Sequence, residues 1–231
     1  MSTIKTKNVQ VGTDSTASNN FTIYTPGTPD GTVRIGNGDA GAVTDAITLD
    51  SSGNITAAQN LTVSGTTTAT GAITSTGGIY LGGTASANLL DDYEEGSWTP
   101  ALTAVTPVTS VSYLHNTAKY RRIGDLVYVT GAFQISARSG GSGQVIVDGL
   151  PFNVSDELPT TAVEAGGTCA YFGGLTVAKS SVNVWAFNNS TKLYFTATAA
   201  AGNTTILNLD ITETSSSNFQ LRFTISYITD A

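Results

Sequence analysis

Few residues in this sequence have the chemistry for catalysis or metal binding. The densest carboxylates lie in one short run, Asp91-Asp92-Tyr93-Glu94-Glu95. Hydrolysis of a glycosidic bond needs two carboxylates on opposite sides of the sugar, and neighbouring residues do not supply that arrangement. We expect this run to form a solvated collar. The alternative is a site for a divalent cation such as Ca²⁺, which prefers carboxylate oxygens.

The other reactive groups occur singly. His115 is the only histidine, and no Gly-x-Ser-x-Gly nucleophile motif accompanies it. Cys169 is the only cysteine, which excludes an intrachain disulfide and predicts a buried, inert thiol. The Gly-rich segment 139–143 lacks the Lys-Ser/Thr pair of a phosphate-binding loop and predicts a hairpin loop. We therefore expect no enzyme activity, no metal and no cofactor.

Aromatic residues beside amides are better candidates for ligand binding, because sugar rings stack on aromatic faces while amides bond sugar hydroxyls. Trp185 lies near Asn183 and Asn188, and Tyr171 is followed closely by two glycines. We predict that Trp185, Asn183, Asn188 and Tyr171 contact a receptor. The alternative for Trp185 is packing in the core or between subunits.

Composition restricts both the fold and the partners. Residues that favour helices are scarce, whereas the chain has 38 Thr and 22 Ser among runs of Val, Ile, Tyr and Phe, which predicts an all-β fold. The net charge of −7 argues against nucleic acid as a partner. No run of 18 apolar residues is present, so we expect no membrane insertion.

Strand-like runs lie in two separate regions. In residues 1–45, the runs Thr22–Tyr24 and Thr32–Ile35 are separated by a turn rich in Pro and Gly. Residues 89–231 contain about eight such runs, including separate strands at 125–135 and 144–147. The last run, 219–228, alternates apolar and polar residues, as in a half-buried strand. This C-terminal region predicts an antiparallel, jelly-roll-like β-sandwich.

Residues 46–88 between these regions follow a six-residue period of glycines and aliphatic residues. The aliphatic positions are Leu49, Ile55, Leu61, Ile73 and Ile79. One buried Ile or Leu contributes about 1.5–3 kcal/mol, whereas ordering six residues costs roughly 6–12 kcal/mol. A single chain cannot meet that cost, but three chains around one axis can bury three aliphatic side chains in each layer. We predict an intertwined trimeric β shaft with these five residues as its core; a flexible linker is the alternative.

Three sequence blocks resemble the C-terminal heads of bacteriophage tail fibres. They are Leu90-Asp91-Asp92-Tyr93-Glu94-Glu95-Gly96-Ser97-Trp98-Thr99-Pro100, Tyr120-Arg121-Arg122-Ile123-Gly124-Asp125-Leu126-Val127-Tyr128-Val129 and Gly149-Leu150-Pro151-Phe152. The start, Ser2-Thr3-Ile4-Lys5, and the Thr-rich segment after it are similar to fibres of phages that infect aquatic bacteria, including cyanobacteria.

The resemblance implies a non-enzymatic, homotrimeric fibre of the virion, made in the host cytoplasm. Residues 1–45 would attach to the tail or baseplate, residues 46–88 would form the shaft, and residues 89–231 would be the head. The head would bind a host-surface glycan or lipopolysaccharide during adsorption. Two other functions remain open at this point: a virion connector or collar fibre that touches no receptor, and a glycan depolymerase.

Overall fold

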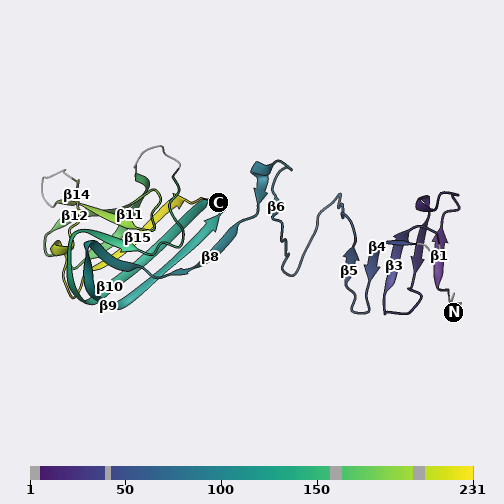
Figure 1. Cartoon of the computed structure of the whole chain (residues 1–231), viewed down its shortest axis with the longest axis horizontal. Helices are drawn as coiled ribbons and strands as arrows, with labels where there is room; N and C mark the ends of the chain where they lie inside the picture. Colours follow the sequence, from purple (N-terminus) through teal and green to yellow (C-terminus); the bar gives the residue numbers. More distant parts are fainter. Residues whose placement is uncertain (1–5, 40–42, 157–162, 200–205, 231) are drawn as a thin grey trace. The chain divides into compact units, whose positions relative to one another are not determined.

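The N-terminal strands form where apolar and polar residues alternate between turn-forming residues. The computed structural model describes residues 6–39, 43–156, 163–199 and 206–230. Its first sheet is an antiparallel meander of five strands (Figure 1): β1 (Asn8–Val11), β2 (Phe21–Tyr24), β3 (Val33–Asn37), β4 (Thr44–Leu49) and β5 (Ile55–Ala57). The predicted pair of strands around residue 28 is confirmed as β2 and β3. The start of the chain, Ser2–Lys5, lies outside the described residues.

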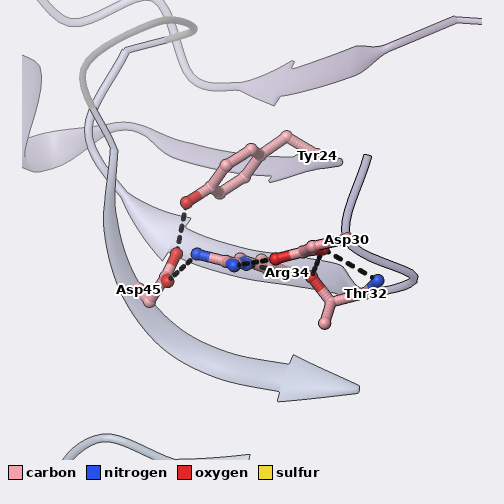
Figure 2. A network of polar contacts seen from close by, with 5 residues as sticks. All are labelled: Tyr24, Asp30, Thr32, Arg34 and Asp45. Atoms are coloured by element: carbon pink, nitrogen blue, oxygen red, sulfur yellow. Dashed lines mark hydrogen bonds and ion pairs between the residues drawn. The ribbon is translucent and has the colours of Figure 1, made fainter. Parts of the chain in front are cut away.

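One face of this sheet carries a network of charged and hydroxyl groups around Arg34 (Figure 2). The Arg34 guanidinium donates to Asp45 at 2.8 Å and also to Asp30. The hydroxyl of Tyr24 donates to the second oxygen of Asp45. Thr32 donates to Asp30 through its hydroxyl at 2.6 Å and its backbone N–H at 3.0 Å. One cation and two carboxylates thus link β3 to β4 and to the turn that precedes β3.

This network predicts that the N-terminal sheet loses stability in acid. Hydrogen bonds from the Thr32 hydroxyl and backbone N–H, together with Arg34, lower the pKa of Asp30 below its ordinary value of 3.8. Because the pKa in the folded state lies below the unfolded value, the stabilisation is present above about pH 4 and is lost as the pH falls further. Circular dichroism measures the melting temperature of the full chain between pH 7 and 3. We expect the first sheet to melt at a lower temperature as the pH falls below about 4.

The variant Asp30→Asn removes the titrating group, so its melting curve should depend less on pH than that of the unaltered chain. Asp230→Asn is the control, because Asp230 is exposed and lies in the other unit of the chain. Equal pH dependence in the Asp30→Asn variant and the unaltered chain would contradict the prediction.

The opposite face of the first sheet is apolar and exposed. Cross-strand pairing places Val9, Ile23, Ile35 and Ile47 in one row across β1 to β4. Including the neighbouring rows, nine large apolar side chains of β1–β5 are between 37% and 72% exposed: Val9, Val11, Phe21, Ile23, Val33, Ile35, Ile47, Leu49 and Ile55. Isolated exposed apolar residues are ordinary, but a contiguous face of this kind indicates an interaction surface.

The six-residue series continues from this face into the following segment. Leu49 and Ile55, its first two members, pair with each other across β4 and β5. Leu61 and Ile73 are 76% and 71% exposed, and Ile79 lies in β6 (Ile79–Tyr80), which pairs with β7 (Leu89–Leu90). By contacts the chain divides into two units, Met1–Ile73 and Thr74–Ala231. The trimeric shaft stays a prediction, because a single copy cannot display contacts between copies.

The second unit contains one antiparallel sheet of eight strands that closes on itself. After β8 (Tyr93–Trp98), two strands of 23 residues, β9 (Ala101–Ile123) and β10 (Leu126–Asp148), form a long hairpin (Figure 1). The others are β11 (Val163–Gly173), β12 (Lys179–Phe187), β13 (Leu193–Ala199), β14 (Ile206–Asn208) and β15 (Gln220–Ile228). Their order is β14-β13-β12-β11-β15-β10-β9-β8, and the end of β10 also pairs with β13. Short 3-10 helices lie at Ala17–Asn19, Ser86–Asn88 and Ile211–Glu213.

This topology confirms the all-β prediction and refines it. The closing pair β10–β13 joins five strands, β10, β15, β11, β12 and β13, into a ring instead of the predicted jelly-roll-like sandwich. The predicted alternation of the last strand is confirmed: Leu221, Phe223, Ile225 and Tyr227 of β15 are buried, and the residues between them are not. The buried side chains of β10, β12, β13 and β15 fill the inside of the closed sheet.

The Gly-rich segment 139–143 is not the predicted hairpin loop, because it lies inside β10. Ser139, Gly140 and Ser142 pair with residues of β9, and the register shifts between Ser139 and Gly140 and again between Ser142 and Val145. Gly140, Gly141 and Gly143 have φ angles of +68°, +87° and +81°. Glycine adopts such angles without strain, which permits bulges that bend a strand while it continues. The predicted strands 125–135 and 144–147 are therefore parts of one strand, β10. This strand pairs with β9 and β15, and its end also pairs with β13.

Candidate functional site

A continuous row of polar residues crosses the outer face of the second sheet. Each member pairs with the next across neighbouring strands from β8 to β14. In order, the row is Ser97, Lys119, Thr130, Thr224, Thr168, Asn183, Thr196 and Asn208. None of them is buried. We call these eight residues the polar row; their hydroxyl, amide and ammonium groups are suited to hydrogen bonding with a polyhydroxylated ligand.

An aromatic cluster flanks the polar row on β12 and β13. Trp185 stacks on Tyr194 with ring centroids 4.9 Å apart and meets Phe187 edge-on at 4.5 Å. The three side chains are half-buried on the outer face. The cross-strand pair of Trp185 and Tyr194 lies two residues along β12 from the pair of Asn183 and Thr196. Gly166, opposite Trp185 on β11, has open space where a side chain would lie. Trp185 and Asn183 thus lie on the same face of β12, and the strand beside Trp185 carries no side chain at Gly166.

Two substitutions distinguish the contribution of the Trp185 ring to stability from that of its N–H group. The indole Nε1 is buried and has no hydrogen-bond partner in the part of the chain that the structure describes. Trp185→Phe removes this unsatisfied donor and keeps an aromatic ring, so we expect a melting temperature within a few degrees of the unaltered chain. Trp185→Ala also removes the stacking on Tyr194 and should destabilise the head by about 2–4 kcal/mol. Denaturant unfolding of both variants measures the difference, and equal destabilisation would contradict it.

Asn188 occupies a different position from the other predicted contact residues. Its side chain and that of Asn189 both donate to Asp156, the latter at 3.0 Å. Asn189 has a φ angle of +51° in the turn after β12, and its backbone N–H donates to the carbonyl of Val154 at 2.9 Å. These contacts tie the β12–β13 turn to the segment after β10. The Asn188 side chain is therefore engaged in holding this turn.

Tyr171 lies beside a hollow that the sequence did not reveal. On β11 it is 48% exposed, and the Arg222 guanidinium lies over its ring at 5.4 Å. A hollow of about 670 Å³ extends from Arg222 across β10 to Lys119 on β9 and Ser97 on β8. Thr130 and Thr224 of the polar row also line it. Alternation along β9 predicts which face of the strand carries Lys119. It does not predict that Arg222, 103 residues away in sequence, lies on the same surface.

The acidic run 91–95 is partnered by side chains of β9. Asp92 forms an ion pair with Arg122 at 2.7 Å, and Glu95 lies 3.6 Å from Arg121. The hydroxyl of Tyr120 donates to Glu94. Pairing of β8 with β9 produces these contacts, because Glu94 and Glu95 are opposite Arg122 and Arg121. The carboxylates 92, 94 and 95 thus hold β8 to the sheet edge.

The single reactive residues lie apart from one another. Burial raises the pKa of the Cys169 thiol to about 12, which keeps it protonated at neutral pH, as an inert thiol would be. His115 is half-buried on β9 opposite Gln134 of β10.

Within the described ranges, no group of three or more His, Cys, Asp or Glu side chains is placed to hold a metal ion. No helix among those residues is long and apolar enough to cross a membrane.

Comparison with known proteins yields a partial structural similarity. The crystal structure of the Dettilon tailspike protein (gp208) is similar over 59% of this chain, with 19% sequence identity and a TM-score of 0.46. The matched region covers 24% of that protein, so the chain spans about a quarter of the tailspike's length. No protein-family model and no curated protein matches the chain.

Proposed function

We propose that this protein is a receptor-binding fibre of a phage tail, a homotrimer whose head binds a host-surface glycan or lipopolysaccharide. The observation that carries the proposal is the polar row with its aromatic neighbours, because eight polar residues from eight strands share one exposed face. Trp185 and Tyr194 beside Asn183 and Thr196 provide stacking and hydrogen bonding together. The sequence blocks at 90–100, 120–129 and 149–152, which resemble fibre heads, support the same function.

The exposed apolar surface of the N-terminal unit supports the homotrimer. Nine apolar side chains of β1–β5 share one exposed face, and the following Leu61 and Ile73 are also exposed, as in a surface that contacts a partner. Other copies of this chain present the same face and the same six-residue spacing, so they are matched partners for it. Three heads on one fibre would gain affinity through effective concentration, which lets each site bind weakly.

In this role the protein is part of the virion, and its N-terminal region attaches to a tail or baseplate protein. The chain carries out no catalytic step and needs no cofactor. The head would act by adhesion alone, through the outer face of its sheet.

Binding of the full chain to an array of bacterial lipopolysaccharides and capsular polysaccharides tests the function. We expect binding to at least one polymer, and a loss of at least tenfold in affinity for the double variant Asn183→Ala with Thr196→Ala. Ser217→Ala, at an exposed position outside the polar row, is the matched control. Absence of binding to every polymer and to bacterial cells would favour a connector without a receptor, and release of reducing ends would indicate a depolymerase.

A further inference from the structure

Two cations on the outer face of the head lie at either end of the hollow described above. Lys119 is exposed on β9 and Arg222 is exposed on β15, with β10 between them. Two strand spacings and a two-residue offset separate their Cβ atoms by about 12 Å. Side chains of this length can bridge such a gap. The Arg222 guanidinium lies over Tyr171 of β11, on the side of β15 away from Lys119, and would turn toward β10 to do so. A small anionic group between them would contact both.

No described carboxylate forms an ion pair with Lys119 or Arg222. Among the described residues, the ion pairs of the head engage Arg121, Arg122 and Lys179, and none involves Lys119 or Arg222. Glu95 lines the adjoining surface together with Lys119, and it lies 3.6 Å from Arg121. The contact of Arg222 with the Tyr171 ring orients the guanidinium and leaves its charge available.

The floor between the two cations is built from small residues. Thr130 pairs with both Lys119 and Thr224, and Ala132 pairs with both Thr117 and Arg222. Threonine hydroxyls offer hydrogen bonds, while the alanine and the threonine methyl groups leave room and an apolar surface. The hollow of about 670 Å³ is large enough for a sugar residue carrying a charged substituent.

We propose that Lys119 and Arg222 bind the carboxylate or phosphate group of an acidic saccharide, whose hydroxyls rest on Thr130 and Thr224. This site rests on the proposed function, and it specifies that the receptor carries negative charge. The chain as a whole has a net charge of −7, so binding of an anionic ligand depends on local positive charge such as that of Lys119 and Arg222. The binding should weaken as salt is raised, because exposed charges are screened over about 10 Å at 0.1 M ionic strength.

Calorimetric titration of the full chain with trigalacturonate tests the carboxylate, and titration with glucose 6-phosphate tests the phosphate. Maltotriose is the neutral comparison. We expect one of the two anionic probes to bind at least tenfold more tightly than maltotriose, and the double variant Lys119→Gln with Arg222→Gln to lose that difference. Lys192→Gln is the matched control, because Lys192 is exposed, makes no ion pair among the described residues and lies on β12–β13 connecting residues.

Three results would overturn the site: binding of neither anion, equal binding by the double variant, or a changed molecular mass of the double variant, which would make the hollow a contact between copies. The polysaccharide array separates this failure from failure of the proposed function. A double variant that binds the array as the unaltered chain does would exclude the anionic site and leave adhesion intact. An unaltered chain that binds no polymer would remove both.

Discussion

Replacing Phe223 by alanine is expected to lower the free energy of unfolding of the head by about 3–5 kcal/mol, a large share of the 5–15 kcal/mol typical of a domain. Phe223 is 2% exposed, and its ring meets Trp98 at 6.3 Å and Phe195 at 5.6 Å. Its ring also lies under Gly131, where an added Cβ would collide with it. The side chain therefore joins opposite sides of the closed sheet, and its loss leaves a cavity that neighbouring strands cannot fill.

Urea unfolding followed by tryptophan fluorescence measures the effect, since Trp98 contacts the substituted ring. Ser226→Ala is the control on the same strand, because Ser226 is exposed and its loss should change stability by less than about 0.5 kcal/mol. An unfolding midpoint of Phe223→Ala that equals the midpoint of the control would show that the core does not depend on this ring.

The triple variant Ile55→Ser, Leu61→Ser and Ile73→Ser is expected to convert a trimer of about 71 kDa into a monomer of 23.7 kDa. These three side chains are between 71% and 76% exposed in a single copy. Each contributes about 1.5–3 kcal/mol when buried, and three copies would bury nine of them. Replacing them by serine removes this apolar area while it keeps the backbone and the spacing of the glycines.

Light scattering on a size-exclusion column measures the mass. The matched control replaces the next residue after each aliphatic position, as Thr56→Ser, Thr62→Ser and Thr74→Ser, and should remain trimeric. Circular dichroism of the head strands checks that the triple variant is still folded. A monomeric unaltered chain, or a triple variant that stays trimeric, would refute the trimeric shaft and return residues 46–88 to a linker.

The predicted contact residues show how far sequence neighbours remain neighbours in the fold. Trp185 and Asn183 are two residues apart on one strand, so they face the same side, as alternation requires. Asn188 follows the strand end and turns toward Asp156 instead. Tyr171 lies on the adjacent strand, but a register shift after Cys169 places it opposite Arg222. The four predicted residues are thus divided among the aromatic cluster (Trp185), the polar row (Asn183), a turn (Asn188) and the surface beside the hollow (Tyr171).

The sequence by itself determined the all-β class, the strands β2 and β3 of the N-terminal sheet and the two faces of the last strand, because each follows from alternation and turn residues within a short window. It also determined the six-residue series of aliphatic side chains. The tertiary structure alone decided that Ser139–Gly143 continues a strand, that β10 closes the sheet on β13, and that Lys119 and Arg222 share a hollow. These features depend on pairing between strands up to about a hundred residues apart, whose register is set by the packing of the whole core.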